Sequence, residues 1–289
     1  MDFLAYNERM RKFFILFIFL FPLWSFAAAP SITVFPERII QGEPFRVVVE
    51  NVSGASAVRI ISFNGRSLGI VLYQGKPTAF IGIDLNKKPA DYKITVTLAD
   101  GSVLKKTITI GSREKVEAPV GIPEKLGGNT PQAAKAVVSS LAQENKTIYS
   151  VRTIPKQLWT GSFNFPFSNP IVTDTYGYSR QTVGQVITHK GTDFRAKEGT
   201  SIAAMNRGIV RFAKNTKIYG NTVILDHGLG LHTVYMHLSK IKVNEGELVK
   251  QGQLLGLSGK TGYVVAPHLH LSVWIDKVSI DPMKFMELF

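Results

Sequence analysis

Histidine is the residue type in this sequence that could do chemistry, and its distribution is uneven. All six histidines lie in the last hundred or so of the 289 residues, and the chain has no cysteine. Five of them fall in three short motifs, namely THKGTDF with His189 and Asp193, LHTVYMHLS with His232 and His237, and APHLHLSVW with His268 and His270. Neutral imidazole and carboxylate are the ligands that zinc accepts when no thiolate is offered. The pattern therefore predicts a zinc site in a hydrolytic enzyme.

The HLHLSVW motif reads as a β-strand. Side chains at positions i and i+2 of a strand point to one face, so His268 and His270 are expected to share a surface while Leu269 and Leu271 face the core. Two imidazoles on one face suit a metal site, or a ligand beside an acid–base group. The alternative is a pair of ordinary surface histidines.

The HKGTD motif places His189 four residues before Asp193. The same spacing would share one face of a helix, but the intervening Gly191 and Thr192 argue against a helix. We therefore expect a strand end that runs into a turn, which lets both side chains converge on one ion.

In LHTVYMHLS, His232 and His237 are five residues apart and would face opposite sides of a regular strand. Tyr235 and His237 would share a face, so His237 is the better catalytic candidate. His232 is expected to be structural, as is His227 in the turn LDHGLG. Two other polar residues near the motifs, Arg180 and Thr261, are expected to belong to the scaffold.

The elements that must position these residues read as β-structure throughout the C-terminal part. Residues 161–289 contain strand-like runs such as GIVRFAK, NTVILDH and HLHLSVWI, with glycines at the turns, and predict a compact β barrel-sandwich domain. Residues 30–111 hold a series of short strands separated by turn signals, and predict an immunoglobulin-like sandwich with an accessory role. The fold class is therefore mainly β. Residues 112–160, rich in Pro and Gly at first, predict a linker with one short helix near 131–144.

The N-terminus has the features of an export signal. Basic residues precede the apolar run FFILFIFLFPLW and the small residues SFAAA, so residues 1–29 are expected to be a signal peptide. The alternative is an uncleaved membrane anchor, although the run is shorter than the ~20 residues that a spanning helix needs. We expect no membrane span after cleavage. No lipid-accepting cysteine follows the signal, and no disulfide can form.

The charge of the chain indicates an anionic partner. The formal net charge is +13, and removal of residues 1–29 leaves 31 basic and 19 acidic side chains, a charge of +12. A strongly basic exported protein favours anionic polymers such as the cell wall. No motif interleaves aromatic and basic residues in the way that reads bases, so nucleic acid is not expected as a partner.

Together, HKGTD, YMHLS and PHLHLSVW occur in the order found in lysostaphin/LytM-type zinc endopeptidases, with GKTG upstream of the last motif. The chain resembles this family over roughly residues 165–285. The resemblance implies Zn²⁺ as cofactor, with His189, Asp193 and His270 as metal ligands and His237 and His268 as the catalytic pair. It implies hydrolysis of peptide cross-links or stems of peptidoglycan, with a zinc-bound water as nucleophile.

Two other functions remain open alongside this expectation. One is a catalytically silent wall-binding regulator of other hydrolases, although all five positions of the motif are filled. The other is an enzyme held latent by its own N-terminal region. The absence of a wall-anchoring motif favours the periplasm of a Gram-negative bacterium, and the other options are secretion or association with the cell wall.

Overall fold

The chain forms a two-part, mainly β structure. We describe it from a computed structural model that covers residues 28–119 and 121–289. The expected signal peptide lies outside the described residues except for Ala28 and Ala29. Within the described ranges, no helix is long and apolar enough to cross a membrane.

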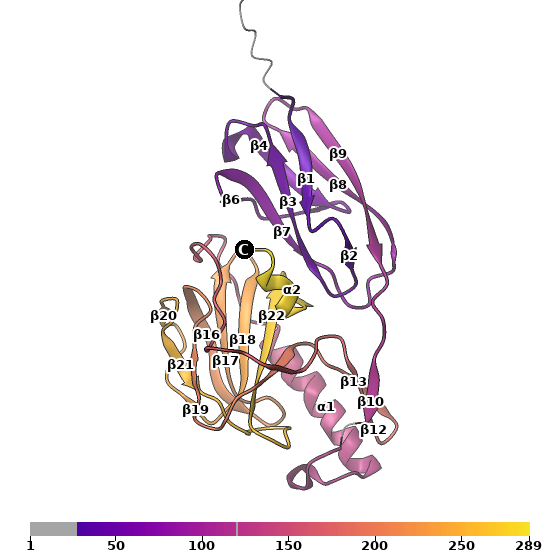
Figure 1. The fold of residues 1–289 in the computed structure, drawn as a ribbon, viewed down its shortest axis with the longest axis vertical. Helices are drawn as coiled ribbons and strands as arrows, with labels where there is room; N and C mark the ends of the chain where they lie inside the picture. The colour runs from indigo at the N-terminus through magenta and orange to yellow at the C-terminus, as the bar shows by residue number, and fades with distance from the viewer. Residues whose placement is uncertain (1–27, 120) are drawn as a thin grey trace, which may run out of the picture.

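The N-terminal part is a sandwich of two sheets, drawn in indigo and purple in Figure 1. One sheet has the order β1 (Ser31–Phe35), β3 (Pro44–Glu50), β7 (Lys76–Gly82), β6 (Val71–Tyr73). The other has the order β2 (Ile39–Ile40), β9 (Val103–Gly111), β8 (Ala90–Leu98), β4 (Val58–Phe63), β5 (Arg66–Ser67). A short 3-10 helix, η1 (Ala55–Ala57), precedes β4. Alternate residues of both sheets, such as Val47 and Val96, meet in one apolar core.

The segment that joins the two parts is more ordered than a flexible linker. It contains β10 (Glu117–Pro119), the 3-10 helix η2 (Glu124–Leu126) and α1 (Pro131–Ile148). Helix α1 begins with Pro131 at its first position, and the Thr130 side chain accepts a hydrogen bond from the Ala133 amide. It extends four residues past the expected end because Ile148 is buried against the C-terminal sheet.

The C-terminal part is built on one long sheet. Its order is β11 (Val172–Asp174), β14 (Thr192–Arg195), β22 (His268–Ile275), β18 (Leu231–Leu238), β17 (Gly220–Gly228), β16 (Gly208–Thr216), β20 (Leu248–Val249), with β23 (Val278–Ile280) also on β22. A second sheet has the order β15 (Ser201–Ala203), β21 (Leu254–Leu257), β19 (Lys240–Ile241). A hairpin of β12 (Ser179–Thr182) and β13 (Gln185–Thr188) pairs with β10, and α2 (Pro282–Met286) ends the chain.

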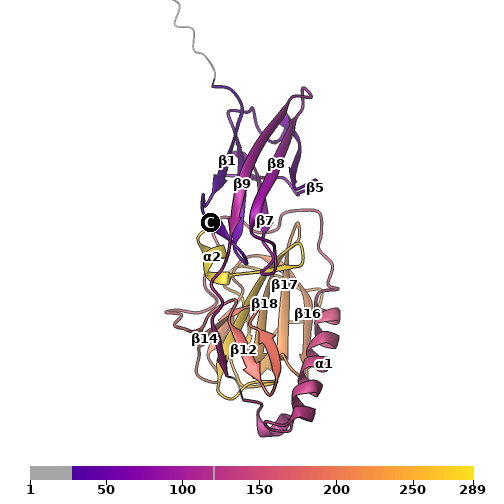
Figure 2. The same cartoon turned by 90° about the vertical axis from the view of Figure 1, so that its right-hand side faces the viewer.

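Strand β22 has the candidate site on one face and the main apolar core on the other. Its residues Leu269, Leu271 and Val273 pack into the main apolar core of the C-terminal part. Because alternate side chains of a strand point to opposite faces, His270 lies on the other side of the sheet, together with Trp274. That face is the one against which the end of α1 packs, since the rings of Tyr149 and Trp274 are 4.4 Å apart. Figure 2 shows α1 along one side of this sheet.

The sandwich and the C-terminal part are in contact through apolar side chains and an ion pair. Phe80 of β7 stacks on Phe289, with ring centroids 4.9 Å apart, and a Cβ on Gly82 would press against Ile280. Arg113 forms an ion pair with Asp281, at 3.1 Å, where α2 begins. The C-terminus therefore lies at the junction of the two parts (Figure 1).

Candidate metal centre

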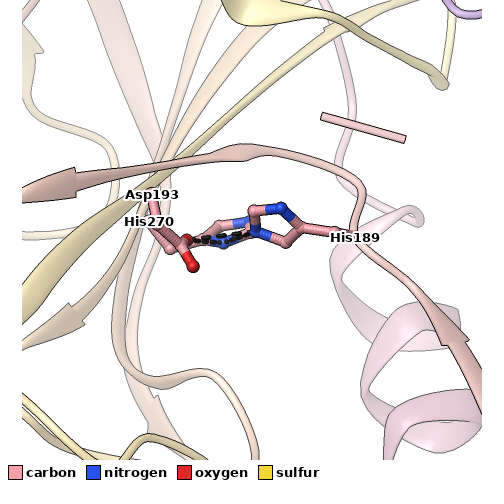
Figure 3. Close-up of side chains that lie close together, drawn as sticks. All are labelled: His189, Asp193 and His270. Carbon is pink, nitrogen blue, oxygen red and sulfur yellow. Dashed lines mark hydrogen bonds and ion pairs between the residues drawn. The ribbon is translucent and has the colours of Figure 1, made fainter. Parts of the chain in front are cut away.

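The turn between β13 and β14 brings together the residues of the HKGTD motif. His189 follows the last residue of β13, and Asp193 lies in β14 opposite His270 of β22. Asp193 Oδ1 is 2.7 Å from Nδ1 of His270 and 3.1 Å from Nε2 of His189, and these two nitrogens are 3.0 Å apart. All three side chains are buried. Figure 3 shows the three groups converging on one point.

The hydrogen-bond partners of the two imidazoles leave their inner nitrogens as acceptors. Nδ1 of His189 lies 2.8 Å from the carbonyl oxygen of Thr175, so it must carry the proton. Ser272 Oγ donates to the carbonyl of Lys190 and therefore accepts from Nε2 of His270, at 2.9 Å. Two lone pairs and a carboxylate oxygen then face one another, an arrangement that repels unless a cation lies among them. Two imidazole nitrogens and one carboxylate oxygen are donor types that zinc binds. Their number also fits, because catalytic zinc sites have three protein ligands and an open fourth position.

His237 reaches the site through an unusual backbone conformation. Regular alternation would send it into the core with Tyr235, so the expectation that these two share a face is wrong. His237 has φ 61°, in the left-handed region, and its ring lies 5.0 Å from that of His268 and 5.9 Å from that of His270. A left-handed conformation costs about 1–3 kcal/mol in a residue other than glycine, and such costs concentrate at functional sites.

The rings of His237 and His268 are held by backbone carbonyls, as the ring of His189 is. Nδ1 of His237 donates to the Thr261 carbonyl at 2.9 Å, and Nδ1 of His268 donates to the Ala266 carbonyl at 2.9 Å. Each Nε2 is thus left as a proton acceptor, and that of His268 lies 3.7 Å from Asp193 Oδ1. Burial lowers the pKa of His237 well below its usual value. Electrostatic repulsion from His268 and His270 lowers it further. His237 is therefore neutral near pH 7.

The titration of His270 and Asp193 also favours the forms that bind a metal. Burial lowers the pKa of His270 to about 4, and its contacts with Asp193 offset only part of that effect. Burial alone would raise the pKa of Asp193, but the neighbouring imidazoles of His189 and His270 hold it well below its usual range. An unprotonated imidazole and a carboxylate are the forms that bind a cation.

Two residues expected to belong to the scaffold contact the site directly. Arg180 forms an ion pair with Asp193, with Nη2 and Oδ2 2.7 Å apart. The carbonyl of Thr261 orients His237. The contact of Arg180 depends on the pairing of β12 with β13, which carries it beside β14, and no local spacing in the sequence gives that. His227 and His232 lie outside the cluster: His227 bonds the Arg207 carbonyl and Thr233, and His232 lies 3.8 Å from Asp226.

Two cavities flank the centre. One, of about 400 Å³, is lined by His189, His237 and His270 on one side and by Leu141, Asn145 and Tyr149 at α1 on the other. The second, of about 430 Å³, borders Asp193, Arg195 and His268, and is lined also by Gly121 and Pro123 of the joining segment. The centre is therefore approached from two sides, and the segment between the two parts of the chain borders both.

Comparison with known proteins identifies the family of the C-terminal part. Residues 187–282 match the sequence model of peptidase family M23. The C-terminal part of the chain is thus a domain of peptidase family M23.

Two of the named relatives come from Gram-negative bacteria. The chain is 41% identical over 100 residues to the peptidoglycan DD-endopeptidase ShyA of Vibrio cholerae, covering 35% of this chain and 23% of that protein. It is 32% identical over 125 residues to the DD-carboxypeptidase/endopeptidase Mpg of Neisseria meningitidis, covering 43% of this chain and 29% of the relative. The matched region thus spans about a quarter of the length of these curated relatives.

One solved structure matches nearly the whole chain. It is described as a peptidase M23 from Pseudomonas aeruginosa, is 25% identical, and covers 87% of this chain and 96% of its own, with a TM-score of 0.64. The match therefore extends beyond the M23 domain.

Proposed function

We propose that this chain is a zinc-dependent endopeptidase that hydrolyses peptide cross-links or stems of bacterial peptidoglycan. The observation that carries the proposal is the convergence of His189, Asp193 and His270 within an M23 domain, with all donor atoms within 4.8 Å of one another. The three residues would hold the zinc, which when bound would supply a Lewis acid for the scissile carbonyl and for the water that serves as nucleophile.

His237 and His268 serve the proton transfers of the reaction. Both present an unprotonated Nε2 on the side of the ligands, since each Nδ1 donates to a backbone carbonyl. One imidazole accepts the proton of the attacking water, and an imidazolium formed there stabilises the developing negative charge and protonates the leaving amine. The enclosed setting of His237 strengthens such interactions because water is excluded.

The substrate follows from the charge of the chain and the names of its relatives. Peptidoglycan stems carry carboxylates, and the net charge of +13 favours an anionic polymer. Arg195, which is exposed and lines the cavity beside His268, offers a partner for such a carboxylate. Relatives named as peptidoglycan endopeptidases in Gram-negative bacteria support a periplasmic location.

The test is the mass analysis of muropeptides released from purified sacculi by the parent protein, with and without a zinc chelator. Peptide-cleaved products should appear, disappear with chelator and return when zinc is restored. His270→Ala should release none, whereas His232→Gln, a change at a buried histidine outside the cluster, should release the parental set. Digestion by His270→Ala at the parental rate would contradict the proposal.

A latent form of this enzyme is supported by a specific observation. The joining segment lies against both cavities, with the Tyr263 hydroxyl bonded to the Gly121 carbonyl at 3.1 Å and Lys125 Nζ bonded to the Lys260 carbonyl at 3.2 Å. On the other side, the Glu144 carboxylate of α1 accepts from the Ile218 and Tyr219 amides. We infer that this segment acts as an internal inhibitor that must move before a wall peptide binds. A catalytically silent regulator is less well supported, since all five site residues are present.

A further inference from the structure

The two carboxylate oxygens of Asp193 have different partners, and Arg180 binds one of them. Oδ1 of Asp193 lies among the donor atoms of His189 and His270, at 3.1 and 2.7 Å. Oδ2 lies 2.7 Å from Nη2 of Arg180. One oxygen of the carboxylate therefore faces the metal position while the other is occupied by a guanidinium.

A second carboxylate holds the guanidinium in place. Asp174 Oδ2 accepts from Nη2 of Arg180 at 2.5 Å and from Nε at 3.1 Å. A guanidinium cannot be deprotonated under the conditions in which proteins fold. Arg180 therefore stays charged in this mostly enclosed position.

The backbone around Arg180 is fixed by its neighbours. In β12 it lies opposite Ile187 of β13 on one side and Ala118 of β10 on the other. Asp174 belongs to β11, which pairs with the strand of Asp193. The whole arrangement is carried by paired strands, which hold a side chain more firmly than a loop does.

This geometry matters because an aspartate can bind a metal through one oxygen or through both. An unrestrained Asp193 could turn its second oxygen to the ion and fill the position that water and substrate need. A charge-assisted hydrogen bond to the second oxygen prevents that rotation and adjusts the charge that the ligand donates.

We propose that Arg180 is a positioning residue that restricts Asp193 to one-oxygen coordination, with Asp174 as its anchor. The inference rests on the proposed function in one respect, namely that His189, Asp193 and His270 bind zinc.

The test measures metal binding rather than hydrolysis. Arg180→Gln in the full chain should raise the zinc dissociation constant by about 10–100-fold in competition with a chromophoric chelator. Arg180→Lys, which keeps the charge but not the planar fork, should have a smaller effect. In the cobalt-substituted protein, Arg180→Gln should weaken the visible band, because a two-oxygen Asp193 raises the coordination number above four.

A matched control is available in the same domain. Arg211 forms an ion pair with the buried Asp226 through Nε and Nη2, at 3.1 and 2.9 Å, away from the site. Arg211→Gln should lower stability yet retain the parental zinc affinity and cobalt spectrum. A similar loss of zinc affinity in Arg211→Gln would overturn the inference, since the effect would then be one of general stability.

The remaining outcomes also decide the matter. If the parent binds zinc and Arg180→Gln matches it in affinity and cobalt spectrum, the positioning role is refuted while the proposed function stands. If the parent binds no zinc, the proposed function itself fails. Should Arg180→Gln not fold, Asp174→Asn replaces it: weaker zinc binding supports the role, and unchanged binding refutes it.

Discussion

His237 lies against His268, with ring centroids 5.0 Å apart, because its backbone leaves the strand conformation at that residue. The two rings belong to different strands, β18 and β22, which are neighbours in the long sheet. A regular conformation at His237 would have buried its ring in the apolar core. The pairing thus depends on one left-handed residue at the end of a strand.

Substitution at these two positions should separate catalysis from metal binding. His237→Ala and His268→Ala should each lower kcat by about 10²–10⁴-fold, as expected when a proton-transfer group is removed. Both should keep one zinc per chain, because neither residue supplies a donor atom to the cluster. His270→Ala should lose both zinc and activity. Zinc content by atomic absorption, measured beside turnover on sacculi, checks the distinction, and loss of zinc from His237→Ala would count against the assigned roles.

Gly191 should tolerate no side chain. A Cβ at this position would overlap the imidazole of His270 and lie 2.6 Å from the Leu271 carbonyl oxygen. Gly191→Ala should therefore displace His270 and weaken zinc binding by at least about tenfold. The control is Gly69→Ala, whose methyl group would meet Leu229 at an ordinary contact distance of 3.5 Å. Isothermal titration with zinc compares the two variants, and equal affinities would show that the turn adapts.

Release of α1 should raise activity if the enzyme is latent. The Glu144→Ala and Asn145→Ala double variant removes the carboxylate that binds the Ile218 amide at 2.9 Å and the amide oxygen that accepts from the Tyr219 hydroxyl at 2.7 Å. Hydrogen bonds to a charged group contribute about 1.5–3 kcal/mol, so the open fraction should rise about tenfold or more. Dye release from labelled sacculi measures the rate. Gln143→Ala, an exposed neighbour on the helix, is the control, and a double variant that is folded but no faster would argue against latency.

The stability of the chain should fall below neutral pH because of His227. Burial lowers the pKa of this residue to about 4. The unfolded state, with a pKa near 6.5, then binds a proton that the folded state does not, so the stabilisation is complete above pH 6.5 and decreases as the pH falls toward 4. Between pH 7 and pH 5 the loss should be about 2 kcal/mol.

Urea unfolding of the parent and of His227→Asn at both pH values isolates this contribution. The variant should be less stable at pH 7 but should lose about 2 kcal/mol less than the parent between the two pH values. Equal losses in the two proteins would mean that other groups account for the pH dependence.

The spacing of residues within each motif predicted most of the candidate site, but it did not predict the backbone of His237 or the contact of Arg180 with Asp193. Strand alternation predicted that His268 and His270 share a face opposite Leu269, and the turn in HKGTD predicted the approach of His189 to Asp193. The same rule placed His237 on the wrong face of its strand. Alternation assumes regular backbone dihedral angles, and the φ of 61° at His237 lies outside the strand region. The contact of Arg180 could not be predicted either, because it joins β12 to β11 and β14, which belong to a different sheet.

The mainly β class was predictable from the alternating runs, and the helix was predicted in the right place. Its last turn was not, since the helix continues to Ile148 because Ile148 and the following Tyr149 pack against Trp274. The order of the joining segment was missed for a similar reason. Its Pro- and Gly-rich composition is typical of a flexible connector, but β10 finds a partner in β12.

The stacking of Phe289 on Phe80 has a practical consequence. The terminal aromatic ring is covered by the sandwich, and Arg46 also bonds the Leu288 carbonyl. An apolar surface shared by the two halves of the molecule links their stabilities. We therefore expect the two parts to unfold as one cooperative unit. Cutting the chain between the two parts would leave two fragments that each expose aromatic side chains and are prone to aggregate. A fusion tag attached after Phe289 would begin at the boundary between the two parts.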